Sequence, residues 1–131
     1  MQASYKLQQN LLSLFERCLS LDSEGMFVWA FNRTFLLLAT GSTDPEEMLR
    51  TFIVKIQDYL ELFWEKNPEI WKHIDKILYT SCLMISQPLQ KIWPHLSSQN
   101  QEMIWKHWYG MIRVALGSEE TLKIKYSKWF E

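Results

Sequence analysis

The residues best suited to chemistry are three histidines, each of which ends an Ile-Trp-x-His string. The strings occupy 70–73, 92–95 and 104–107. Their spacings differ, and the strings fall near the start, near the end and in the middle of expected helices, so the resemblance among them is interpreted as coincidence in a Trp-rich chain. A zinc site on a helix needs ligands at close spacings such as HxxxH, and no such pair occurs. No metal site is expected.

Haem ligation needs only one histidine in an apolar pocket. His107 suits this role best, because it falls between Met111 and Val114 on the helical wheel of its segment. His73 is the second candidate. A small helical carrier of haem, pigment or lipid is therefore the alternative function. A buried histidine that bonds a carbonyl or carboxylate is the commoner situation, so no cofactor is expected.

Catalysis is not indicated by the remaining reactive groups. Cys18 lies on a Leu-rich helix face where nothing lowers a thiol pKa. The paired carboxylates, Glu46-Glu47 and Glu119-Glu120, fall in helix first turns, where negative charge offsets the helix dipole. The four glycines are isolated and form no phosphate-binding loop. We expect a protein that is not an enzyme.

Length and composition bound the remaining classes. A chain of 131 residues with 47% hydrophobic residues fits one globular domain, residues 1–131. The net charge of −1 gives no basic footprint for nucleic acid. No apolar run approaches the ~20 residues of a membrane span, and no signal pattern opens the chain. With two cysteines outside any CxxC motif, a cytoplasmic protein is expected.

Hydrophobic periodicity predicts an all-α fold, a single-domain antiparallel bundle of five to six helices. The segments expected to be helical are about 4–20, 25–40, 45 to the Asn67-Pro68 break, 68–86, a short turn through 92–93, 98–116, and a last helix after Ser118. Asp44-Pro45 is the clearest start signal, an N-cap followed by Pro at the first helical position. Ser98 with Gln101 resembles a second capping box, at the start of the helix 98–116. Gly117 is the expected stop of that helix, and Ser118 is the expected N-cap of the last helix.

The segment 25–40 is apolar almost all round, which is typical of the buried centre of a bundle. A hairpin is the alternative for these residues. Arg33 is the one charge in the middle of this segment. Its stem can lie along the core with the guanidinium at the bundle edge. The sharper alternative is a buried Arg33 that pairs with a Glu or receives an anionic ligand.

Aromatic residues make up 15% of the chain, and the segment 98–116 carries more apolar surface than one core flank needs. Trp105, Tyr109 and Leu116 extend the apolar stripe of this segment to about two thirds of the circumference of the expected helix. We expect these three, with Trp93 or Trp129 nearby, to form a groove for a peptide, a helix or a second copy of the chain. The function predicted is that of a non-enzymatic protein–protein interaction module: an adaptor, assembly factor or regulatory protein.

The alternative is that the last helix buries this flank within one molecule. Leu122, Tyr126 and Trp129 are spaced to do so. In that case a partner could still displace the helix.

Overall fold

The computed structural model describes residues 2–21, 44–77 and 86–131, and every regular element in these ranges is a helix. The α-helices are α1 (Ala3–Ser20), α3 (Pro45–Ile56), α4 (Leu60–Trp64), α5 (Ile74–Ile77), α6 (Ser86–Ile92), α7 (Ser98–Gly117) and α8 (Glu120–Lys125). The 3-10 turns are η1 (Gln57–Tyr59), η2 (Pro68–His73), η3 (Trp93–His95) and η4 (Ser127–Phe130). The all-α class is confirmed.

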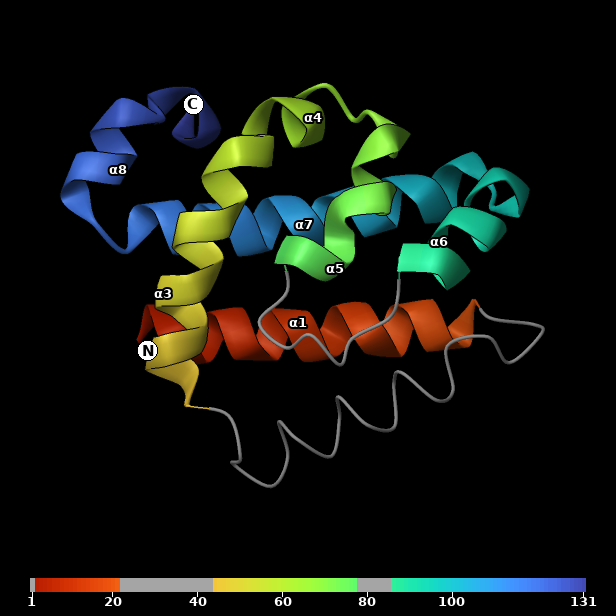
Figure 1. Cartoon of the computed structure of the whole chain (residues 1–131), viewed down its shortest axis with the longest axis horizontal. Helices are drawn as coiled ribbons and strands as arrows, with labels where there is room; N and C mark the ends of the chain where they lie inside the picture. The colour runs from red at the N-terminus through yellow and green to blue at the C-terminus, as the bar shows by residue number, and fades with distance from the viewer. Residues whose placement is uncertain (1, 22–43, 78–85) are drawn as a thin grey trace.

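The two longest of these helices, α1 and α7, form the frame. They pack along each other, and they run in opposite directions in Figure 1. Helix α3 packs against both and lies across them, while α4 lies on the side of α7 away from the start of α3 (Figure 1). Antiparallel packing of all successive helices stays a prediction.

Aromatic rings dominate the centre of the core. Phe63 stacks on Trp108 with ring centroids 4.9 Å apart, and it meets Trp105 edge-on at 6.4 Å. Trp71 stacks on Trp105 at 4.6 Å. All four side chains are buried. Offset and edge-to-face ring pairs add about 0.5–1.5 kcal/mol each beyond the burial of area, so this cluster fixes α4 and η2 against α7.

The segment from Pro45 to Trp64 was predicted as one helix but divides at η1. Tyr59 leaves helical geometry, with φ −121° and ψ 7°. A 3-10 turn rotates the chain further per residue than an α-helix does. Ile53 and Ile56 face the core before this turn, and Leu60 and Phe63 face it after the turn. Trp64, which the uninterrupted wheel placed on the apolar face, is instead 43% exposed.

The Asn67-Pro68 break occurs as predicted, but the element after it differs from the expected long helix. Lys66 adopts φ 53°, the left-handed conformation that ends a helix. The side chain of Asn67 then accepts a hydrogen bond from the amide of Glu69. The chain continues as the 3-10 turn η2, and α5 begins only at Ile74. Ile70, Trp71 and Ile74 are buried, so the short elements still supply core side chains.

Two of the three predicted caps are wrong in detail. Asp44 caps α3 as expected, accepting from the amide of Glu46 at 3.1 Å. Ser97, not Ser98, caps α7, and the side-chain amide of Gln101 donates to the carbonyl of Trp93 instead of closing a capping box. Ser118 bonds back to the carbonyl of Ala115 and does not cap α8. Helix α7 was predicted to run to Leu116 with Gly117 as its stop, and it ends one residue later, at Gly117, with Ser118 as the C-cap.

The predicted central helix 25–40, with Arg33 and the hairpin alternative, lies outside the described residues, as does the end of the predicted helix 68–86. Nothing in the described ranges bears on either expectation.

Trp105 is 4% exposed inside this ring cluster, and so it should contribute to stability. We expect Trp105→Ala to lower the free energy of unfolding by about 3–5 kcal/mol, because the substitution removes a large buried ring and leaves a cavity. Urea denaturation followed by circular dichroism measures this. The control is Lys106→Ala at the neighbouring exposed position, expected within about 0.5 kcal/mol of the unsubstituted chain. A Trp105→Ala loss below about 1 kcal/mol contradicts this burial of the ring.

Candidate functional site

The residues predicted to line one aromatic groove separate into two groups. Trp93 and Trp105 contact each other, with ring centroids 5.3 Å apart, and both are buried in the core. Leu116 is also fully buried. Tyr109 and Trp129 form the second group, 5.3 Å apart. The first three side chains are core residues. In the second group Trp129 is buried as well, but Tyr109 is half-buried and receives Trp129 from the last segment of the chain.

The second group is made by the end of the chain, which folds back on the bundle. We call α8 and η4, residues 120–130, the C-terminal arm. Figure 1 shows the arm turning back above α7 toward α4. The alternative in which the last helix covers the aromatic flank holds for Tyr109, which Trp129 covers, but Trp105 is covered by Phe63, Trp71 and Trp93.

Trp129 anchors the arm. It is 1% exposed, and its ring meets Trp64 at 5.1 Å and Tyr109 at 5.3 Å, both edge-on. Its indole Nε1 is buried without a hydrogen-bond acceptor among the described residues. An unpaired buried donor costs about 1–3 kcal/mol, so the anchor fits the rings well but leaves part of its hydrogen-bonding capacity unused.

Polar contacts surround this anchor. The Nε of Arg113 donates to the backbone carbonyl of Trp129 at 2.7 Å. The hydroxyl of Tyr126 donates to Oε1 of Gln57 at 3.0 Å. The ammonium of Lys128 pairs with Glu61 at 2.7 Å and lies 4.8 Å from the centre of the Trp64 ring. The side chains that receive the arm are defined here as the docking face: Gln57, Glu61, Trp64, Tyr109 and Arg113.

The docking face is held together by contacts that do not involve the arm. The hydroxyl of Tyr109 donates to the carbonyl of Phe63 at 3.0 Å, which ties α7 to α4. Lys66, just after α4, pairs with Glu102 of α7 at 2.6 Å. Burial raises the pKa of Tyr109, and the hydrogen bond to Glu102 raises the pKa of Lys66, so both groups keep the protonation that these bonds need at neutral pH. The face can therefore persist when the arm is absent.

Sequence reasoning missed most of this face. It named Tyr109 and Trp129 but not Trp64, Glu61 or Arg113. Trp64 was assigned to the core because the break at η1 was not foreseen. Arg113 is a single charge on a helix, and its partner is a backbone carbonyl, which no sequence pattern reveals. No sequence pattern singles out Trp64 among the aromatic residues as the ring that packs on Trp129.

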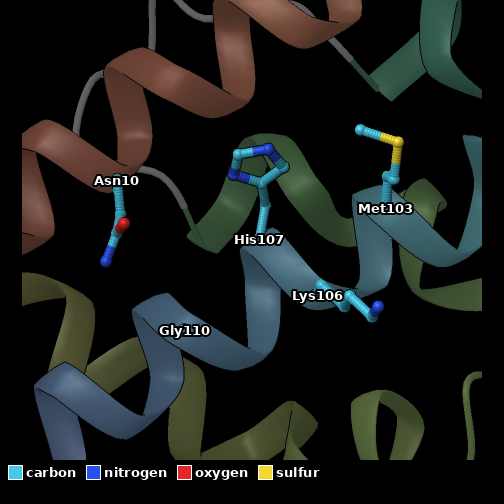
Figure 2. A pocket seen from close by; sticks show the side chains of 5 residues that line it. All are labelled: Asn10, Met103, Lys106, His107 and Gly110. Carbon is cyan, nitrogen blue, oxygen red and sulfur yellow. The ribbon is translucent and has the colours of Figure 1, made fainter.

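The histidine candidates occupy other places. Figure 2 shows His107 and Met103 projecting from α7 beside Asn10 of α1, with Lys106 pointing away from them. These residues and Gly110 line a pocket of about 310 Å³. Met103 is its one large apolar side chain among the described residues, which is poorly suited to haem. His107 also lines a second pocket of about 370 Å³, together with Ser13, Glu16, Arg17 and Ser20 of α1.

His73 stacks on Tyr59 at 5.2 Å, and its Nδ1 is buried without a hydrogen-bond partner among the described residues. His95 is exposed in η3. In the ranges that the structure describes, no three His, Cys, Asp or Glu side chains gather as a metal site would require. None of the helices in these ranges is long and apolar enough to span a membrane.

No family model, curated protein or solved structure matches this chain.

The surroundings of His107 predict a pH effect. Burial and the charge of Arg17 lower its pKa from the ordinary 6.5. The unfolded chain then binds more protons than the folded chain, so stability from His107 is present above about pH 6.5 and is lost as the pH falls through the folded pKa. NMR titration of the imidazole should show the lowered pKa, and Arg17→Gln should raise it. Arg50→Gln, an exposed arginine on α3, is the matched control and should leave it unchanged; an equal response to both substitutions contradicts the assignment.

Proposed function

We propose that this chain is a non-enzymatic protein–protein interaction module, and that its binding surface is the docking face that its own C-terminal arm covers. The observation that carries the proposal is the way Trp129 docks. The buried indole of Trp129 lies against Trp64 and Tyr109. Beside it, Arg113 of the face bonds the backbone carbonyl of Trp129, and Glu61 of the face bonds Lys128 of the arm. Aromatic anchors with a polar rim are how short segments of one protein bind another.

The chemistry of the face defines the segment that fits it. Trp64 and Tyr109 favour an aromatic or other large apolar anchor. Arg113 supplies a donor for a main-chain carbonyl or a carboxylate. Glu61 favours a basic residue beside the anchor, as Lys128 precedes Trp129. A partner segment with an aromatic residue next to a Lys or Arg therefore reproduces the contacts that the arm makes.

We expect such a segment to compete with the arm, because the arm has one fully buried anchor and its other apolar side chains, Leu122, Tyr126 and Phe130, pack only partly against the core. No residue of α8 is buried, so Trp129 is the one buried side chain of the arm. Lys128 and Glu61 are 39% and 70% exposed, and pairs of this kind contribute about 0–1 kcal/mol. The unpaired Nε1 of Trp129 reduces the gain further. A segment that keeps the anchor and supplies the missing acceptor should bind better than the arm.

Binding in trans tests this proposal. The protein is the full chain with Trp129→Ala, and the probe is a fluorescent peptide of residues 119–131. We expect fluorescence anisotropy to show saturable binding to the variant and at least about tenfold weaker binding to the unsubstituted chain, whose own arm competes at an effective concentration near the millimolar range.

Two controls isolate the anchor and the face. A peptide carrying Trp129→Ala should not bind. A chain carrying both Trp64→Ala and Trp129→Ala should bind the normal peptide several-fold more weakly than Trp129→Ala alone. Circular dichroism establishes that each variant is folded. If folded Trp129→Ala does not bind the peptide at millimolar concentration, the docking face is not a binding surface and the proposal fails.

A further inference from the structure

The arm turns back because of a single residue. Ser118 keeps helical dihedral angles, φ −74° and ψ −17°, directly after α7. Glu119 is extended, with φ −130° and ψ 129°, and α8 begins at the next residue. The Glu119 side chain makes no capping hydrogen bond. If Glu119 alone took helical angles, α7 and α8 would merge into one helix of about 40 Å.

The apolar residues keep the same helical phase across this break. Trp108, Ile112 and Ala115 form the buried stripe of α7. At 100° per residue, Leu122 and Tyr126 fall within about 40° of the direction of Trp108 if the helix continues to the end of α8. Tyr126 then leaves helical angles, with φ −113° and ψ 42°, and Trp129 follows in η4. The sequence of the arm is therefore compatible with two conformations, the bent one of this structure and a straight extension of α7 that carries the same apolar face outward.

We propose that the docking face also receives the arm of a second copy of this chain, by exchange at Glu119; this rests on the proposed function. In the exchanged dimer each α7 continues into α8, and each Trp129 packs between Trp64 and Tyr109 of the other molecule. The two interfaces are identical by symmetry, so the pair closes and does not polymerise. Every contact between arm and face that the single chain makes is formed again.

The balance between bent and exchanged forms depends on two quantities. The bent form has the advantage of an effective arm concentration near the millimolar range. The exchanged form gains helical backbone at two hinges. Because the arm–face contacts are the same in both forms, a change at position 119 should alter the dimerisation constant without altering the face.

Glu119→Ala and Glu119→Gly form a matched pair of variants. Both substitutions remove the same negative charge. Neither removes a capping hydrogen bond, because the Glu119 side chain makes none. Gly is about fivefold less favourable than Ala at a helical position, and each dimer contains two hinges. We expect the dimerisation constant of the Ala variant to exceed that of the Gly variant by up to about 25-fold, because Gly also destabilises the ordered extended residue of the bent form and this cancels part of the difference. Sedimentation velocity over a concentration series measures it, and circular dichroism establishes that both variants are folded.

Adding Trp129→Ala to Glu119→Ala should abolish the dimer, because the exchanged arm loses its anchor. Dimers that survive this second substitution form through another surface and overturn the exchange. Equal dimerisation of the Ala and Gly variants, or monomers in both up to millimolar concentration, also overturns it. Binding of the 119–131 peptide distinguishes the two proposals: peptide binding without dimers retains the docking face and rejects exchange between copies.

Discussion

Burial of indole rings against Phe63 is the constraint on which the rest of the structure depends. Phe63 lies between Trp105 and Trp108 of α7 and the Trp71 ring of η2. Rings of this size must be covered on every side, and each covering element also contacts a flank of α7. Helix α1 packs along one flank and α3 with α4 along another. Among the described residues, Trp71 and Trp93 cover the side of α7 that carries Trp105, and the C-terminal arm covers the side that carries Tyr109.

The periodic parts of the sequence predicted the fold class and several elements well. The 3.6-residue spacing of Leu7, Leu11, Leu14 and Cys18 identified α1, and all four are buried. Asp44-Pro45 located the start of α3, and Gly117 the end of α7. These signals are local, because a cap or an apolar stripe depends on neighbours within one or two turns.

The wrong predictions concern residues whose positions depend on contacts outside their own helix, which rules based on neighbouring residues do not describe. Gln101 favoured a capping box at Ser98, but its side chain bonds the carbonyl of Trp93 and the cap moves to Ser97. The break at η1 rotates Trp64 out of the core, and no glycine or proline marks that position. Trp105 and Trp64 thus exchanged their expected roles: the first is core, and the second receives the arm. Tyr109 and Trp129, two of the residues expected around the groove, do contact each other, through the turn at Glu119 that brings the arm back over α7.

The stacked pair Trp71 and Trp105, 4.6 Å apart at 27°, has an optical consequence. Indoles this close and this fixed couple electronically, so they should contribute strongly to the near-ultraviolet circular dichroism that reports rigid tertiary packing. The ring contacts of Trp71 and Trp105 involve no residue of the arm, so undocking of the arm would separate Trp129 from Trp64 without removing a contact of this pair. The molecule therefore contains its own spectroscopic reference, against which loss of the arm can be told apart from melting of the core.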